Sequence, residues 1–205
     1  MKKLVMLLIL SGIISCQNNS QKEKKNQEKP VETLYQIDSV KINWTAYKFT
    51  SRAGVNGAFD KVDWKGLKKG KNGDEMLSSA EFKIEVSSLN TGNPARDKTI
   101  VEYLFGKMME TNFIEGRVKD INDKKMTVVI QMNNREKPVD FDYTLSDNKI
   151  VALGQIDLVK DFDASEPLYF LHTACEDKHT GEDGVSKTWP DVKLIATFYM
   201  SPSKR

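Results

Sequence analysis

Alternation of apolar and polar residues with a period of two is the feature that most limits how this chain can fold. Between Val139 and Leu145, Val139, Phe141, Tyr143 and Leu145 fall on one face, and the residues between them, two aspartates and a threonine, fall on the other. Similar runs occupy residues 42–46, 81–86, 126–133 and 191–200. Each run has one apolar face, as antiparallel strands that cover a core require. The chain is therefore predicted to be mainly β.

Turn-forming residues separate these runs at 71–74, 122–123 and 146–148. The short connection at 146–148 predicts a hairpin between residues 137–145 and 149–158. About eight strands in a domain of roughly 170 residues favour a closed antiparallel barrel, because closure removes exposed strand edges. An eight-stranded barrel is wide enough to be filled by its own side chains or to hold one small ligand, and the pattern leaves both outcomes open.

Two segments are predicted to be short helices. Asn93 is a suitable N-cap and Pro94 a suitable first residue for the first helix. The second helix is expected from about Ala164 to Glu176, with Asp163 or Ser165 as its cap. Apolar residues at helical spacing are Ile100, Leu104 and Met108 in the first segment and Leu168, Leu171 and Cys175 in the second. This spacing predicts a buried, unreactive Cys175.

The N-terminus has the pattern of a bacterial export signal. Two lysines precede the eleven uncharged, mostly apolar residues 4–14, and because a bilayer span needs roughly 20, residues 1–15 are predicted to be a cleaved signal peptide. The segment Ile13–Cys16 resembles the lipobox of bacterial lipoproteins, which implies acylation of Cys16, for example with palmitate, and a membrane anchor. The alternative is an ordinary secretory signal with a chance cysteine.

Residues 17–30 contain no aliphatic or aromatic side chain, so residues 16–32 are predicted to be a lipidated cysteine and a disordered tether. The folded domain then spans residues 33–205. An aspartate directly after the acylated cysteine resembles an inner-membrane retention signal. This chain has Gln17 at that position, which favours the outer membrane. The predicted location is the bacterial cell envelope, lipid-anchored on the periplasmic face of that membrane.

The charged and reactive residues exclude several classes of function. Removing two lysines with the signal peptide lowers the 31 basic residues to 29, equal to the 29 acidic ones, which argues against a nucleic-acid partner. No nucleophile elbow or phosphate-binding glycine loop is present, so no enzyme activity or catalytic residue is predicted. One compact set could ligate a metal, namely His172, Cys175, Glu176 and His179. Because Cys175 belongs to the buried side, no metal and no other cofactor is predicted.

Several segments, in this order and at this spacing, resemble the YceI-like family. They are Tyr35–Asp38, Gly57–Phe59, Ser87–Asn93 followed by Ala95–Asp97, Lys137–Val139 and Trp189–Val192. The resemblance covers about Leu34 to Met200. It implies a lipocalin-like barrel that holds a polyisoprenoid or a similar ligand, such as a fatty-acyl lipid.

The predicted ligand pocket consists of inward-facing apolar residues of the alternating runs. They are Trp44, Phe82, Ile84, Val86, Val128, Ile130, Phe141 and Tyr143. Arg96 and Asp97 lie beside a predicted helix start, where they could bind a lipid phosphate or form an ion pair at the barrel rim. The expected function is therefore a membrane-tethered, non-catalytic carrier or buffer of an amphiphilic lipid. A structural or interaction lipoprotein with a filled barrel is the alternative, and the oligomeric state is left open.

Overall fold

The computed structural model describes residues 32–146 and 148–203. The predicted signal peptide, the lipidated Cys16 and the tether as far as residue 31 lie outside the described residues, so these remain predictions. Among the residues that are described, no helix combines the length and the apolar character needed to cross a bilayer.

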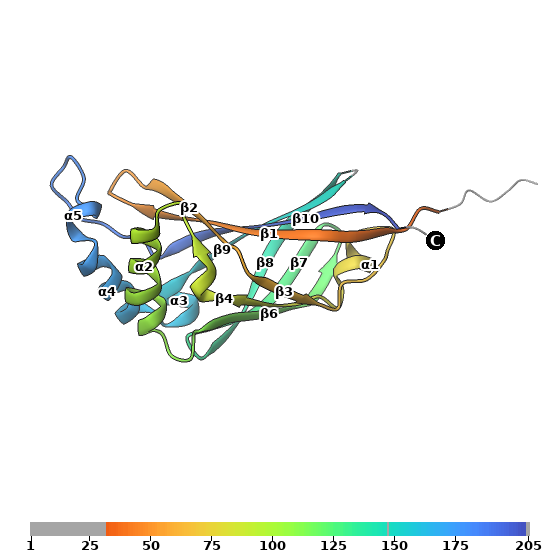
Figure 1. The fold of residues 1–205 in the computed structure, drawn as a ribbon, viewed down its shortest axis with the longest axis horizontal. Coiled ribbons are helices and arrows are strands. Elements are labelled where there is room, and N and C mark those ends of the chain that lie inside the picture. The colour runs from red at the N-terminus through yellow and green to blue at the C-terminus, as the bar shows by residue number, and fades with distance from the viewer. Residues whose placement is uncertain (1–31, 147, 204–205) are drawn as a thin grey trace, which may run out of the picture. The chain divides into compact units, whose positions relative to one another are not determined.

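The described residues form one antiparallel sheet that curls around an apolar core (Figure 1). The strand order is β3-β4-β6-β7-β8-β9-β10-β1-β2-β5. The strands are β1 (Tyr35–Lys48), β2 (Ala53–Phe59), β3 (Val62–Lys65), β4 (Glu81–Glu85), β5 (Leu89–Asn90), β6 (Phe113–Asn122), β7 (Lys125–Met132), β8 (Arg135–Ser146), β9 (Lys149–Asp157) and β10 (Asp191–Pro202). The prediction of a mainly antiparallel β fold is therefore confirmed.

The predicted number of eight strands is wrong, because this part of the chain has ten. Two segments each form two short strands: β2 and β3 are separated at residues 60–61, and β4 and β5 by the 3₁₀ turn η1 (Val86–Ser88). Two backbone hydrogen bonds still cross the breaks, from Asp60 N to Ser88 O (3.0 Å) and from Glu85 N to Lys61 O (3.1 Å). The sheet order thus has two ends, β3 and β5, in place of the continuous ring that was expected.

The hairpin predicted around residues 146–148 is confirmed, since β8 pairs with β9 from Phe141–Gly154 to Ser146–Lys149. Two other hairpins have two-residue turns in which both residues have positive φ, Asp123-Lys124 (50° and 69°) and Asn133-Asn134 (52° and 53°). Such turns match the right-handed twist of the strands that they connect.

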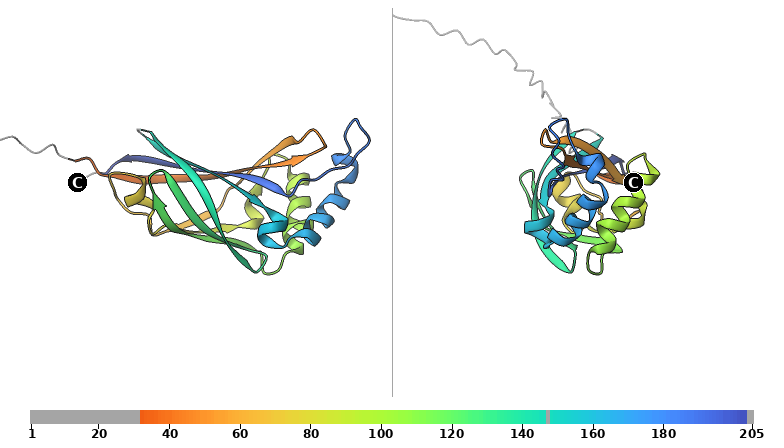
Figure 2. Two further views of the ribbon diagram at one scale, coloured as in Figure 1. Left: turned by 180° about the vertical axis from the view of Figure 1, so that it is seen from behind. Right: turned by 90° about the vertical axis from the view of Figure 1, so that its left-hand side faces the viewer.

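Helices lie at both ends of the sheet. Helix α1 packs on β1 and β6 at one end, whereas α2, the turn η2 and α4 pack on one another at the other end, and face the viewer in the right panel of Figure 2. The helical elements are α1 (Gly73–Leu77), α2 (Pro94–Tyr103), η2 (Phe105–Lys107), α3 (Leu158–Phe162), α4 (Ser165–Ala174) and α5 (Glu176–His179). The sheet therefore has one end near α1 and one helical end, formed by α2, η2 and α4.

The first predicted helix begins as expected, because the Asn93 side chain accepts a hydrogen bond from Arg96 N (3.2 Å) and Pro94 is the first helical residue. The second prediction was too long: α4 ends at Ala174 and is followed by α5. Neither predicted side chain caps α4. Asp163 instead ends α3 with a φ of 54° and its carboxylate pairs with Arg135 (2.8 Å), so it is committed to other contacts.

Candidate functional site

The sheet encloses an apolar cavity of about 170 Å³. All ten described strands contribute lining residues, and α2, η2, α3 and α4 contribute most of the rest. The others are Leu104, between α2 and η2, and Thr188 and Trp189, which precede β10. Among these lining residues Thr188 carries the only hydroxyl group. The interior is therefore apolar apart from this hydroxyl at the helical end and the indole N–H groups of the lining tryptophans.

The size of the cavity determines what can enter without rearrangement. An engineered apolar cavity of about 150 Å³ stays dry and binds benzene, a ring of six carbons. The present cavity thus holds a segment about as long as one isoprene unit, and a longer chain requires lining side chains to move. Met126 and Met132 lie in the wall, and unbranched thioethers adjust readily to irregular shapes.

Six of the eight predicted pocket residues line the cavity, and two do not. The six are Trp44, Phe82, Ile84, Val128, Ile130 and Phe141. Val86 is buried (3% exposed), but it lies in η1, where the strand is broken and the alternation no longer fixes the direction of the side chain. Tyr143 is buried against α1, outside the lining. Leu145, on the same predicted face, is 43% exposed.

Three aromatic lining residues lie directly over glycines of the neighbouring strand. In each pair the two residues are cross-strand partners, and a Cβ added to the glycine would come within 2.2–2.6 Å of the ring. The ring therefore occupies space next to the wall that a side chain would otherwise fill, which leaves the centre of the barrel open. The pairs are Trp44 with Gly57, Phe82 with Gly116, and Phe141 with Gly154.

The end near α1 is closed by fully buried side chains. Met76 and Leu77 of α1 are 0% exposed. The Tyr143 hydroxyl donates a hydrogen bond to Asp74 of the same helix, and burial followed by this carboxylate raises the pKa of Tyr143 to about 12. A ligand that enters the cavity is thus excluded from this end.

The predicted rim residues Arg96 and Asp97 do not line the cavity. Arg96 donates from Nε to Thr91 Oγ1 (2.8 Å) and from Nη2 to Thr91 O (3.0 Å), while Asp97 Oδ1 accepts from Thr91 N (2.9 Å). Both side chains hold the loop before α2 against the helix, and no ion pair joins them in the described part of the chain.

The two histidines of the possible metal set share one contact, and its cysteine is buried. Both histidines place Nδ1 against Thr188 Oγ1, and Cys175 is buried, as predicted, with its pKa raised by burial. Within residues 32–146 and 148–203 there is no group of three or more such side chains that could hold a metal ion.

His179 gives the helical end a pH-dependent stability. Burial, and then the nearby charges of Lys48, His172 and Lys178, lower its pKa from 6.5 to about 4. Below pH 6.5 the unfolded chain binds a proton at this imidazole, whereas the folded domain does not. The free energy of unfolding therefore falls as the pH decreases towards 4. We therefore expect His179→Asn to gain stability relative to the unsubstituted protein between pH 6.5 and 4, measured as the difference in Tm. The variant His172→Asn is the control. If the difference in Tm between His179→Asn and the unsubstituted protein did not change between pH 6.5 and 4, the lowered pKa of His179 would be contradicted.

Several lining residues were missed in the sequence. Trp64 and Phe198 line the cavity and pack against each other at 5.2 Å between ring centroids. The short alternation of Val62 and Trp64 with Asp63 and Lys65 was the available signal for the first. Thr188 and Trp189 lie outside any strand and had no periodic signal.

A curled antiparallel sheet around one apolar cavity places this protein in the lipocalin-like class of β folds. Within that class, the YceI-like domain matches residues 35–182, and the chain belongs to the YceI-like family. No curated protein gives a significant match.

Two solved structures share the fold at low sequence identity. A polyisoprenoid-binding domain from Saccharophagus degradans, described as implicated in plant cell wall breakdown, is 14% identical with a TM-score of 0.52, and the alignment covers 82% of this chain and 98% of that one. A variant of the Campylobacter jejuni YceI protein with a monobromobimane guest is 16% identical with a TM-score of 0.50, over 77% and 90% of the two chains.

Proposed function

We propose that this protein is a non-catalytic carrier or buffer that binds a polyisoprenoid or a similar amphiphilic lipid inside its barrel. It acts while anchored through Cys16 to the periplasmic face of the bacterial outer membrane. The observation that carries the proposal is the unfilled apolar cavity, lined by residues from every described strand. Membership of the YceI-like family supports it, as does the polyisoprenoid binding of the Saccharophagus relative.

Burial of the apolar chain favours such binding. Each buried methylene contributes about 0.8 kcal/mol, so a segment of about five carbons contributes about 4 kcal/mol without any polar contact. A barrel that served only as a structural or interaction module would gain stability by filling this space, because an empty cavity costs packing contacts. The rings held against Gly57, Gly116 and Gly154 preserve the space instead.

The proposal is tested by extracting the protein, purified from its native membranes, with organic solvent and identifying released lipids by mass spectrometry. We expect a stoichiometric prenyl or acyl lipid from the unsubstituted protein. Phe141→Asp places a carboxylate in the lining and should reduce the recovered lipid at least tenfold, because an unpaired charge in an apolar site is strongly unfavourable.

Thr144→Asp, on the exposed face of the same strand, is the matched control and should retain the lipid. Circular dichroism establishes that both variants are folded. A folded protein that releases no lipid, and that takes up no prenyl chain when one is added, would refute the proposed function.

A further inference from the structure

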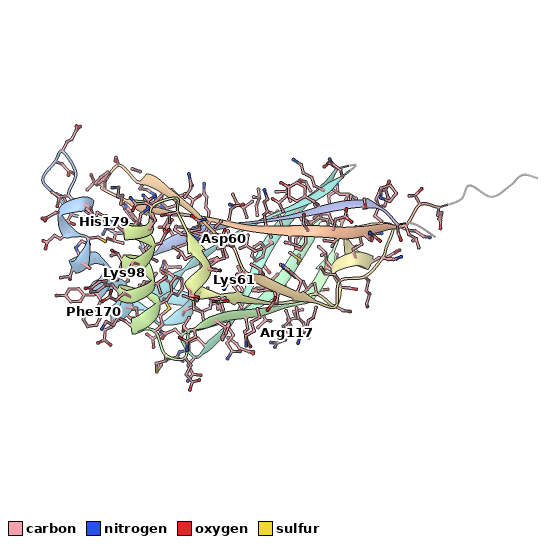
Figure 3. All side chains as sticks on the ribbon, viewed as in Figure 1. Asp60, Lys61, Lys98, Arg117, Phe170 and His179 are labelled. Atoms are coloured by element: carbon pink, nitrogen blue, oxygen red, sulfur yellow. The ribbon has the colours of Figure 1, made fainter. Side chains whose placement is uncertain are left out.

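A polar cluster lies at the helical end of the cavity, where Thr188 meets both histidines of the chain. His172 Nδ1 is 3.0 Å from Thr188 Oγ1, and His179 Nδ1 is 2.6 Å from the same oxygen. The three residues come from α4, α5 and the segment before β10. Figure 3 shows His179 at this end of the sheet, beyond α2.

The backbone around the cluster is fixed by neighbouring elements. Trp189 N donates to Tyr47 O (3.1 Å) and Phe49 N donates to Lys187 O (3.0 Å), so the segment 187–189 continues the sheet beside β1. On its other side Lys187 N donates to His179 O (3.1 Å). The backbone at Thr188 is therefore held between the end of β1 and α5.

The geometry restricts the tautomers of the two imidazoles. A hydroxyl has one hydrogen, so Thr188 can donate to only one Nδ1 and must accept from the other if both contacts are hydrogen bonds. One uncharged ring then carries its hydrogen on Nδ1 and the other on Nε2. Consequently one Nε2 atom is a hydrogen-bond donor and the other is an acceptor.

Of the three cluster residues only Thr188 lines the cavity, and the two histidines lie behind it. Their Nε2 atoms have no partner among the described residues, and neither belongs to the buried polar atoms without a partner, which are the indole Nε1 atoms of Trp44 and Trp64. The lowered pKa of His179 keeps that ring uncharged at neutral pH.

We propose that the His172–Thr188–His179 cluster binds the polar end of the cavity ligand and selects an uncharged head group that both donates and accepts a hydrogen bond, such as an alcohol. This inference rests on the proposed lipid-binding function and adds the class of head group. It also gives the ligand a direction, with the apolar chain pointing towards α1 and the head group at the helical end.

The tautomers can be observed directly. Because the chain contains two histidines, the ¹⁵N resonances of the imidazoles can be assigned with His172→Asn and His179→Asn. At pH 8, where imidazoles are ordinarily uncharged, we expect one ring with its hydrogen on Nδ1 and one with its hydrogen on Nε2. Thr188→Val should remove this pairing, and two rings in the same tautomer in the unsubstituted protein would overturn the inference.

Head-group selection is tested with three probes that share one prenyl chain: farnesol, farnesyl methyl ether and farnesyl phosphate. The methyl ether can accept but not donate. We expect farnesol to bind about three- to tenfold more tightly than the ether, the range for one hydrogen bond, and at least as tightly as the phosphate. In Thr188→Val, a substitution of similar size, the alcohol and the ether should bind equally.

The outcomes separate this inference from the proposed function. If all three probes bind with the same affinity, or if the phosphate binds most tightly, the selection of an uncharged head group is wrong while lipid binding stands. If none binds to the folded protein, both are wrong. Binding of farnesol that is unaffected by Thr188→Val and by either histidine variant would place the head group elsewhere.

Discussion

Ala196→Phe is expected to abolish the uptake of prenyl and acyl chains. Ala196 lies on the inner face of β10 and lines the cavity. The six ring carbons of phenylalanine equal those of the benzene that an apolar cavity of about 150 Å³ accommodates. If the new ring excludes about five carbons of the ligand, the binding free energy becomes less favourable by about 4 kcal/mol. This corresponds to a loss of affinity of about a thousandfold.

The same substitution should leave the domain folded, because overpacking a core typically costs about 1–3 kcal/mol. Thr197→Phe adds the same ring at the next position, on the opposite face of β10, and is the matched control. The measurement is the dissociation constant for farnesol by titration of intrinsic tryptophan fluorescence. Equal affinities for the two variants would mean that the ligand does not occupy the space beside Ala196.

The sheet could be predicted from sequence wherever an alternating run is unbroken. In β8 the pattern from Val139 to Tyr143 gives three residues no more than 7% exposed. It failed at Val86, because a 3₁₀ turn follows β4 and a period of two does not apply across such a turn. The number of strands was wrong for the same reason. The strands are interrupted at residues 60–61 and 86–88, which lie opposite each other in the sheet. Neither segment contains a proline or glycine, the residues that would have predicted an interruption.

The cavity wall was partly predictable, but its emptiness was not. Alternation identifies which side chains point inward, as for Trp44 and Phe141, yet it does not say how far they project. The missing information was the register, which sets Gly57 opposite Trp44 and Gly154 opposite Phe141. The cluster around Thr188 was beyond sequence reasoning, because it depends on three segments whose convergence is fixed only by the fold.

The substitution Asn133→Ala is expected to destabilise the domain by about 3–5 kcal/mol, a large part of the 5–15 kcal/mol typical of a folded domain. Asn133 is 5% exposed. Its Oδ1 accepts from Met109 N (2.8 Å), and its Nδ2 donates to Phe162 O (2.7 Å). One side chain thus joins the β7–β8 hairpin to α3 and to the loop after η2, and its removal leaves two backbone groups without these partners.

Two matched variants separate the side-chain bonds from the backbone conformation, and chemical denaturation measures all three. Asn134→Ala changes the next residue of the turn, which also has positive φ (53°) but is exposed, so it should cost only about 1 kcal/mol of backbone strain. Asn133→Gly tolerates the positive φ but removes the amide. We expect Asn133→Gly to remain far less stable than Asn134→Ala, because the Met109 and Phe162 groups lose their partners in either substitution of Asn133. If Asn133→Gly were instead as stable as the unsubstituted protein, the turn conformation alone would account for the asparagine, and the helical end would be held by other contacts.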